Sequence, residues 1–379
     1  MPMTDVQPQV ARALDLYPLI KQEGNEINRR RELTQPLVAA LKDGQFFRML
    51  QPRSVGGMEM KPSDFSRVTE ALAAADGSVA WVVCQGNGCS MSAAYLDPKV
   101  AKAMFGPVDG ILAWGPPGAP FEAEPVPGGY CISGTWRFAS GSQNAVWLGA
   151  HMKVKGRKEV RTMLFPKSSV QYIDIWHTLG LRGTASNEYV IKDLFVPEDH
   201  TMLRDQAPDR REQGPLYRFT SGQLYSAGFA GVGLGLARGM IDAFLDLPAT
   251  KVSRGAGKPL RENNVVQSQL AQCEAKWHSA RAFLHNTLDE NYDYVARHGE
   301  MTERQAAMMR LASTWAIQQS RDVASTMFHC AGSMAVFEDQ PFERRLRDIN
   351  TVAQQSQGRQ LHYESVGQIM FGMPPENQF

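Results

Sequence analysis

The stretch WRFASGSQNAVW, residues 136–147, places aromatic side chains beside small polar ones. Trp136 and Phe138 have flat apolar faces, and Ser140 and Gly141 follow them directly. An aromatic wall next to a hydrogen-bonding edge suits a flat ring that needs both. The same residue types also suit the interior of a β-domain, where aromatic side chains pack. The stretch by itself leaves both interpretations open.

The glycine-rich segment GVGLGLARG, residues 231–239, invites comparison with a dinucleotide-binding loop. Such a loop follows a strand, so that its glycines turn the chain and open a helix toward a pyrophosphate. Here the preceding YSAGFA is a run typical of a helix, which predicts close helix packing instead. The sequence has no P-loop, HExxH or GxSxG, and its histidines and cysteines have no metal-ligand spacing. We therefore expect no metal site.

Composition restricts the class of protein further. The chain has 379 residues, 43% of them hydrophobic and 21% charged, and a net charge of +1. This balance provides no electrostatic footprint for nucleic acid or for an anionic membrane. No secretory signal or membrane-length apolar run is visible, and the five cysteines are odd in number and scattered. We expect a cytoplasmic protein with reduced thiols.

The chain divides into three parts that differ in the spacing of their apolar residues, and these parts position the residues described above. Residues 1–110 form an expected N-terminal helical domain, with LVAALKDGQFFRML predicted as a helix up to Pro52 and DFSRVTEALAAA as the next helix. Residues 111–215 form an expected antiparallel β-domain, a meander or small barrel, whose strands include GGYCISGTWRF and NEYVIKDLFVP. Residues 216–379 return to long helical periods and predict a helical bundle.

Six segments in this order resemble the acyl-CoA dehydrogenase superfamily over nearly the whole chain. They are PRSVGGMEM, ADGSVAWVV, WRFASG, GLRGTASNEYVIKDLFVPEDH, RGAGKPLRENNVVQSQLA and AGSMAVFEDQPFERRLRD. The ADGSVAW and WRFASG forms are most similar to the two-component flavin-dependent monooxygenases (group D), which hydroxylate aromatic compounds, and to their desulfurisation relatives. The resemblance implies an α+β fold: an N-terminal helical domain, a central β-domain, a C-terminal four-helix bundle and a homotetramer.

The resemblance also implies a flavin site. The family segment that matches Trp136, Phe138, Ser140 and Gly141 lies along the flavin, and a serine matching Ser140 sits near N5 and helps hold the oxygen adduct. The cofactor-binding residues implied in addition are Trp114, Thr184, Ser186, Arg254 and Gln267. Arg254 and Gln267 match the region where one subunit reaches its neighbour's cofactor, and a guanidinium there would pair with phosphate.

The chain departs from the family at its acid–base residues. Acyl-CoA dehydrogenases commonly carry a glutamate shortly after an Arg-Asp pair, whereas here RDINTVAQQSQG contains no carboxylate after Asp348. The monooxygenase branch usually carries a histidine seven residues after this aspartate, and here the position is Gln355. An amide is not a base but can hydrogen-bond a substrate, so Gln355 is expected to contact the substrate.

The first hypothesis is the oxygenase component of a two-component monooxygenase. Reduced FMN or FAD would come from a separate NAD(P)H-flavin reductase, and a flavin hydroperoxide would hydroxylate a small aromatic or heteroaromatic substrate, with Ser140 and Gln355 as the catalytic residues. The alternatives are an acyl-CoA dehydrogenase or related flavin oxidase with a relocated base, and a non-catalytic flavin-binding or scaffold protein. The sequence does not choose between FMN and FAD.

Overall fold

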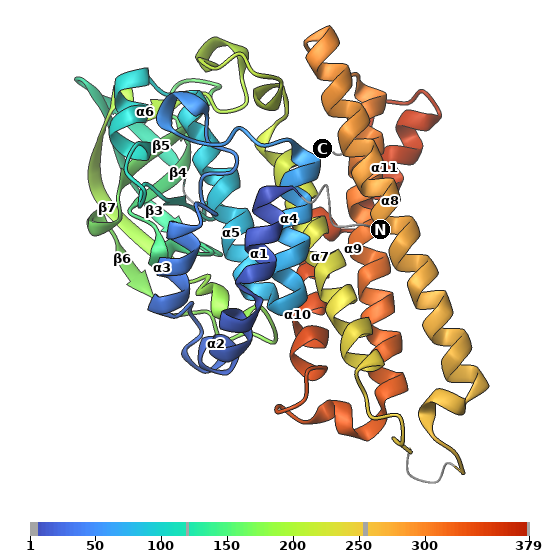
Figure 1. Cartoon of the computed structure of the whole chain (residues 1–379). Helices are drawn as coiled ribbons and strands as arrows, with labels where there is room; N and C mark the ends of the chain where they lie inside the picture. Colours follow the sequence, from blue (N-terminus) through green and yellow to red (C-terminus); the bar gives the residue numbers. More distant parts are fainter. Residues whose placement is uncertain (1–6, 119–120, 253–256, 377–379) are drawn as a thin grey trace.

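Helices from both ends of the chain pack together, and a β-domain lies against one side of them (Figure 1). The computed structural model describes residues 7–118, 121–252 and 257–376. The predicted order of helices, β-domain and helices is confirmed.

The N-terminal part contains six helices in the described residues. They are α1 (Pro8–Asp15), α2 (Tyr17–Arg30), α3 (Gln35–Asp43), α4 (Pro62–Ala75), α5 (Gly77–Ser90) and α6 (Pro98–Phe105). The prediction of one helix running to Pro52 is wrong, because α3 ends at Asp43 and Gly44 caps it. Gln45 then adopts a left-handed backbone with φ 59°, and the apolar side chains after it are buried from a non-helical segment.

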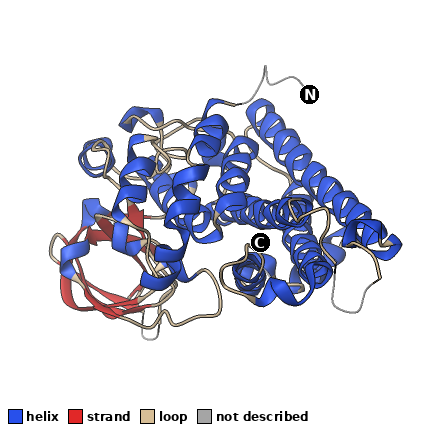
Figure 2. Cartoon of the chain, turned by 60° about the horizontal axis from the view of Figure 1, so that its bottom comes forward, coloured by secondary structure: helices blue, strands red, loops and turns tan. Residues whose placement is uncertain are grey.

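The strands form a curved, mostly antiparallel sheet (Figure 2). They are β1 (Leu112–Ala113), β2 (Glu122–Val126), β3 (Gly129–Trp136), β4 (Trp147–Val154), β5 (Val160–Pro166), β6 (Gln171–Ile173), β7 (Glu188–Pro197) and β8 (Thr201–Met202). Their order is β6-β7-β3-β2-β4-β5-β8, with β1 beside β4. The sheet is not a simple meander, because β1 and β2 each pair with β4 in parallel.

The C-terminal bundle is built from α7 (Ser221–Leu245), α8 (Asn264–His298), α9 (Glu303–Ala331), α10 (Glu343–Gln354) and α11 (Leu361–Met370). Side-chain caps begin the three long helices: Thr220 and Thr302 with capping boxes, and Asn263 through its own side-chain oxygen. The left-handed Gly299 ends α8.

The glycine-rich segment lies inside α7, which confirms helix packing over a dinucleotide loop. A Cβ atom added at Gly231 would lie 2.3 Å from Thr69 Oγ1 and 2.4 Å from the Ser66 carbonyl oxygen, and one at Gly235 would lie 2.1 Å from the Glu70 carbonyl oxygen. These glycines therefore let α4 approach the backbone of α7. By length and composition α7 could also span a membrane, but 78% of its most apolar window is buried, as in a core helix.

Candidate active site

The loop after β3 presents an aromatic ring to the surface from a strained backbone. Phe138 has a φ of +56°, which is uncommon for a bulky residue, and 57% of it is exposed. Its ring makes an edge contact with Trp176, whose indole N–H donates to the Leu181 carbonyl oxygen. Exposure of an aromatic ring on a strained loop is typical of a functional surface.

A chain of hydrogen bonds runs inward from this loop. The Trp81 indole N–H donates to Ser140 Oγ across 3.0 Å. Ser140 Oγ lies 2.6 Å from Ser186 Oγ, which lies 2.6 Å from Thr184 Oγ1. The Thr184 hydroxyl donates to the Leu181 carbonyl oxygen across 2.9 Å. All three hydroxyl groups are buried.

The direction of the protons in this chain follows from counting donors. Each hydroxyl group has one hydrogen, and a carbonyl oxygen can only accept. Because Thr184 donates to Leu181, Ser186 donates to Thr184 and Ser140 donates to Ser186. The reverse direction would leave the Thr184–Leu181 contact without a proton. Ser140 Oγ therefore has its hydrogen turned inward, toward Ser186.

Stacked aromatic rings join α5 to α7 behind Ser140. The rings of Trp81 and Phe229 stack with centroids 3.8 Å apart, and Tyr225 stacks on Phe229 at 5.7 Å. The Tyr225 hydroxyl lies 3.1 Å from Cys89 Sγ. Burial raises the pKa of Cys89 to about 12 and raises the pKa of Tyr225 well above its ordinary value. Cys89 and Tyr225 are therefore uncharged at neutral pH, and neither is a general base there.

The structure brings the predicted Trp114 loop against the Phe138 loop. A Cβ atom at Gly115 would lie 1.7 Å from the Arg137 carbonyl oxygen, so the two backbones touch. Trp114 is buried beneath the Arg204 guanidinium, with the group 4.8 Å from the ring centroid. The side-chain amide of Gln85, on α5, donates a hydrogen bond to the Trp114 carbonyl oxygen across 3.2 Å.

Trp136 lies behind the surface that Phe138 forms. It is fully buried and stacks on Tyr189 with centroids 5.5 Å apart. Its place is the core of the β-domain, since the alternation along β3 turns it inward. Of the two predicted ring contacts, Phe138 is the one that the structure exposes.

Helix α10 fixes the turn that carries Thr184. Asp348 accepts a hydrogen bond from the Leu181 amide across 2.6 Å, and Arg347 donates to the Leu179 carbonyl oxygen across 2.7 Å. Burial, together with the negative charge of Asp76, raises the pKa of Asp348 to about 7. The Arg-Asp pair thus docks the GLRGT segment onto the bundle, in agreement with a packing role.

Gln355 and Gln267 form no hydrogen bond with this cluster. The Gln355 amide caps the turn Ser356–Gly358: its oxygen accepts from the Gln357 amide and its nitrogen donates to Ser356 Oγ. Gln267 is exposed near the start of α8 and donates to the Arg261 carbonyl oxygen. Helix α8 lies on the side of the molecule away from the strands (Figure 1). Arg254 lies outside the described residues.

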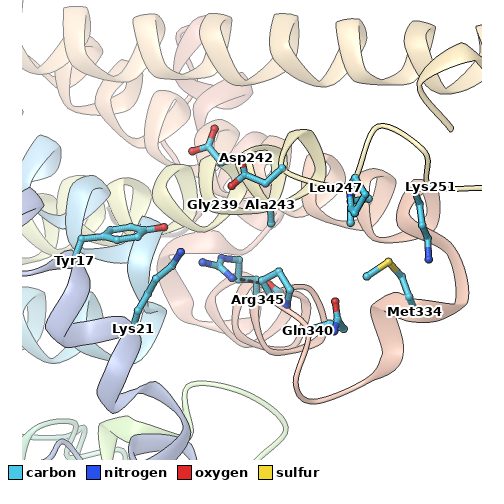
Figure 3. Close-up of a pocket in the computed structure, with 13 residues that line it drawn as sticks. Tyr17, Lys21, Gly239, Asp242, Ala243, Leu247, Lys251, Met334, Gln340 and Arg345 are labelled. Atoms are coloured by element: carbon cyan, nitrogen blue, oxygen red, sulfur yellow. Dashed lines mark hydrogen bonds between the residues drawn. The ribbon is translucent and has the colours of Figure 1, made fainter. Parts of the chain in front are cut away.

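A separate hollow of about 400 Å³ opens between α2, the end of α7 and the start of α10. Figure 3 shows Lys21, Asp242, Lys251 and Arg345 around it. None of the predicted site residues lines it. Among residues 7–118, 121–252 and 257–376, no group of three or more histidine, cysteine or acidic side chains could hold a metal ion.

One residue of the site region was not singled out from the sequence. Trp81 stands in the ADGSVAW motif, but only the structure shows that its N–H meets Ser140.

Comparison with known proteins gives the class of protein to which the sequence and fold of this chain are similar. Residues 227–359 match the family model of the acyl-CoA dehydrogenase C-terminal domain. The chain is 28% identical over 355 residues to an indole-3-acetate monooxygenase of Pseudomonas putida, which is 92% of this chain and 90% of the relative. It is 27% identical over 386 residues to the flavin-dependent monooxygenase oxygenase subunit HsaA of Mycobacterium tuberculosis, which is 98% of this chain and 97% of the relative. The crystal structure of the HsaA monooxygenase from M. tuberculosis matches with a TM-score of 0.88 at 25% identity, covering 98% of this chain and 99% of that one.

These comparisons confirm the predicted resemblance to the acyl-CoA dehydrogenase superfamily and to its two-component monooxygenase branch. They confirm the predicted fold, and they confirm the prediction of an enzyme of the flavin-dependent monooxygenase class with a flavin cofactor. The relatives are monooxygenases, and HsaA is named as an oxygenase subunit.

Proposed function

We propose that this chain is the oxygenase component of a two-component monooxygenase, which uses reduced FMN or FAD and O2 to hydroxylate a small aromatic or heteroaromatic substrate. The observation that supports this most is the directed chain from Trp81 through Ser140 to Thr184, placed beside the exposed Phe138. The substrate class follows the relatives, one of which is an indole-3-acetate monooxygenase.

The residues on the Phe138 loop fit an isoalloxazine. The ring system is flat, apolar on its faces and polar along one edge, so it needs an apolar wall and few polar groups. Phe138 would contact a face, and Ser140 would meet the edge at N5. Gly141, with φ +74°, turns the backbone here, and its amide is held by the Thr184 carbonyl oxygen across 2.9 Å.

The proton direction in the hydroxyl chain favours the reduced ring. The Ser140 hydroxyl group donates its hydrogen bond to Ser186, so Ser140 can offer only a lone pair to a bound flavin. A reduced isoalloxazine has an N–H group at N5 and can donate to that lone pair. The oxidised ring has a lone pair at N5, and two facing lone pairs repel. Ser140 is thus arranged to accept a hydrogen bond from the protonated N5 of the reduced ring.

Bound reduced flavin would supply the two electrons that activate O2. The chain's own contribution is to hold the ring and keep water away, since water and protons at the reacting centre divert the oxygen to hydrogen peroxide. The uncharged ring stack of Trp81, Phe229 and Tyr225 gives such a water-poor wall. Because this wall has no base, we expect a substrate ring that is already electron-rich.

Electrons must then come from another protein. The glycine-rich segment GVGLGLARG, which the sequence offered for comparison with a dinucleotide-binding loop, is the interior of α7. We therefore include in the proposal a separate NAD(P)H-flavin reductase, which agrees with the naming of HsaA as an oxygenase subunit.

The proposal extends to assembly and location. Large apolar side chains are exposed on the C-terminal part, including Trp315, Phe337 and Phe371, and they support a homotetramer built on this part. The five cysteines are free, which supports a cytoplasmic location. Light scattering on the purified protein tests the assembly directly: a monomer at micromolar concentration contradicts the proposed homotetramer.

The experiment that tests the reaction is a coupled assay under 18O2. The protein is mixed with a flavin reductase, NADH, FMN or FAD, and a panel of phenols and indoles, and the products are analysed by mass spectrometry. We expect one 18O atom in an aromatic product. Quantitative hydrogen peroxide with no labelled product across the panel, together with dye reduction driven by an acyl-CoA, would favour the dehydrogenase alternative.

A further inference from the structure

The turn that carries Thr184 has a strained residue at each end. It is a single 3-10 turn, Arg182–Thr184, with Leu181 before it at φ +52° and Ala185 after it at φ +45°. A left-handed backbone is unfavourable for a residue with a side chain, and it persists only where the surroundings hold it. The conformation of this turn is therefore imposed by its contacts.

Leu181 is held from both sides. Its N–H donates to Asp348 Oδ1 across 2.6 Å, whereas its carbonyl oxygen accepts from the Trp176 indole and the Thr184 hydroxyl group, each across 2.9 Å. Leu181, Thr184 and Asp348 are all buried, so these bonds form away from water, where an unmet polar group is costly. One carboxylate from α10 thus holds the residue whose carbonyl oxygen ends the hydroxyl chain.

The segment also has other contacts with α10. Arg347 donates to the Leu179 carbonyl oxygen. A Cβ atom at Gly180 would lie 2.2 Å from the Arg347 carbonyl oxygen and 2.7 Å from the Asp348 nitrogen, so the two backbones touch there. Docking onto the bundle is provided by these contacts. The Asp348 carboxylate is directed instead at the N–H of the strained Leu181.

Loss of the Asp348 acceptor would change what Thr184 meets. A buried amide without a partner is costly, so Leu181 would gain by turning its N–H elsewhere and leaving the left-handed region. A residue that changes its backbone torsion angles also turns its carbonyl oxygen. Thr184 would then lose the acceptor that fixes the direction of its hydrogen, and the order of donors along Ser186 and Ser140 could reverse.

We propose that Asp348 is a positioning residue of the flavin site, which keeps Leu181 left-handed so that its carbonyl oxygen ends the hydroxyl chain and Ser140 faces the ring with a lone pair. This rests on the proposed function and names the residue of the bundle that maintains its preference for the reduced ring. Asp348 acts through Leu181 and not by contact with the flavin.

The test compares loss of the acceptor with its replacement. Reduced and oxidised FMN are titrated, without oxygen, into full-length protein carrying Asp348→Ala or Asp348→Asn, and the ratio of the two dissociation constants is measured. In Asp348→Ala we expect the preference for the reduced ring to fall roughly tenfold, about the effect of one hydrogen bond. Asp348→Asn keeps an oxygen acceptor for Leu181 and should retain the wild-type ratio. A general loosening of the fold would weaken both redox states together and leave the ratio unchanged.

Relief of the strain gives a second arm to the test. Glycine adopts the left-handed backbone without the cost that leucine bears. Adding Leu181→Gly to Asp348→Ala should therefore restore part of the ratio. Hydrogen exchange of the peptide that contains Leu181, followed without flavin, should be faster in Asp348→Ala than in Asp348→Asn.

Asn350→Ala is the matched control on the same helix, because the Asn350 amide donates to the Leu346 carbonyl oxygen within α10, and its ratio should equal that of the wild type. A ratio that Asp348→Ala leaves unchanged, or that falls as far in Asp348→Asn, overturns the proposal. A double variant whose ratio stays at that of Asp348→Ala overturns it too. If Asp348→Ala does not fold, Asp348→Ser takes its place, because the serine hydroxyl group is too short to reach the Leu181 amide.

The wild type distinguishes failure of this proposal from failure of the proposed function. A preference for reduced flavin that Asp348→Ala does not alter rejects only the positioning role. Equal binding of the two redox states rejects the polarity of Ser140 and the positioning role with it. Failure to bind reduced flavin rejects the proposed function as well.

Discussion

The indole N–H of Trp81 donates to the hydroxyl oxygen of Ser140 across 3.0 Å, joining α5 of the N-terminal part to the loop after β3. This bond uses one of the two lone pairs of Ser140 Oγ. The Ser140 hydroxyl group donates its own hydrogen bond to Ser186 Oγ. One lone pair is left to face a ligand. In the proposed flavin site, the preference for the reduced ring would therefore be set by Trp81, Ser186 and Thr184, which lie behind Ser140.

Thr184→Val should reduce the preference for reduced over oxidised flavin. Without the Thr184 hydroxyl nothing fixes the proton direction, so Ser186 can donate to Ser140 and Ser140 can donate to an oxidised N5. We expect the ratio of the two dissociation constants to fall by roughly tenfold, about the net effect of one hydrogen bond.

Anaerobic titration with reduced and oxidised FMN measures this ratio. Thr184→Ser keeps the hydroxyl group and should retain the wild-type ratio. A ratio that Thr184→Val leaves unchanged would show that Thr184 does not set the polarity of Ser140.

Ser140→Ala should increase the release of hydrogen peroxide from the proposed flavin site. The substitution removes the hydroxyl group proposed to accept from N5–H and leaves the exposed Phe138 in place, so we expect the reduced ring to bind but to be held less well. We expect weaker binding of reduced flavin and a larger share of NADH electrons ending as hydrogen peroxide, by roughly tenfold for one lost hydrogen bond. Peroxide yield per NADH in the coupled assay reports this, and an unchanged yield removes Ser140 from the mechanism.

Asp348→Asn should change how stability depends on pH. Asp348 is buried beside Asp76, with Arg344 and Arg347 nearby, and its pKa is raised to about 7 in the folded protein. Because this exceeds the pKa of an unfolded aspartate, the folded state holds the proton more tightly. The resulting stability is present at low pH and is lost as pH rises toward and through 7.

Asparagine does not titrate and still accepts the Leu181 amide hydrogen bond. The variant should therefore gain on the wild type between about pH 4 and about pH 7, by at most about 1.4 kcal/mol per pH unit. Urea unfolding at both pH values gives the difference. A difference that does not vary with pH contradicts the shifted pKa.

Gly231→Ala should destabilise the protein although alanine favours helices. Its Cβ would meet the Ser66 carbonyl oxygen at 2.4 Å, which is backbone and cannot move aside cheaply. We expect a loss of about 1–3 kcal/mol in the free energy of unfolding. Gly367→Ala, within α11 and with nothing inside 4 Å of the added Cβ, should instead be neutral or stabilising by up to about 1 kcal/mol. Equal effects of the two substitutions would show that α4 does not press on α7 at Gly231.

The sequence allowed the fold to be predicted because each part has its own periodicity. The capped, breaker-free runs of α8 and α9 are visible directly, and so is the helical character around Gly231. The end of α3 was missed because Phe46 and Phe47 continue an apolar spacing from a non-helical segment. The parallel pairing of β2 with β4 joins two strands that are separated in the sequence by β3, and no local pattern indicates it.

The site was predictable where it is local and not where it depends on packing. Phe138, Ser140 and Gly141 are adjacent, so their shared loop follows from the sequence. Trp81 and Ser140 are 59 residues apart in the sequence. They meet only because α5 packs against the β-domain. The inward turn of Trp136 depends on the register of β3 with β7.

The most direct measurement is the reaction of the reduced-flavin complex with oxygen. The protein is saturated with reduced FMN or FAD without oxygen, and then mixed rapidly with O2 while the flavin absorbance is followed. A monooxygenase site predicts a distinct absorbing species that outlives the oxidation of free reduced flavin and decays faster in Ser140→Ala. Reoxidation at the free-flavin rate, with no such species, contradicts the central claim.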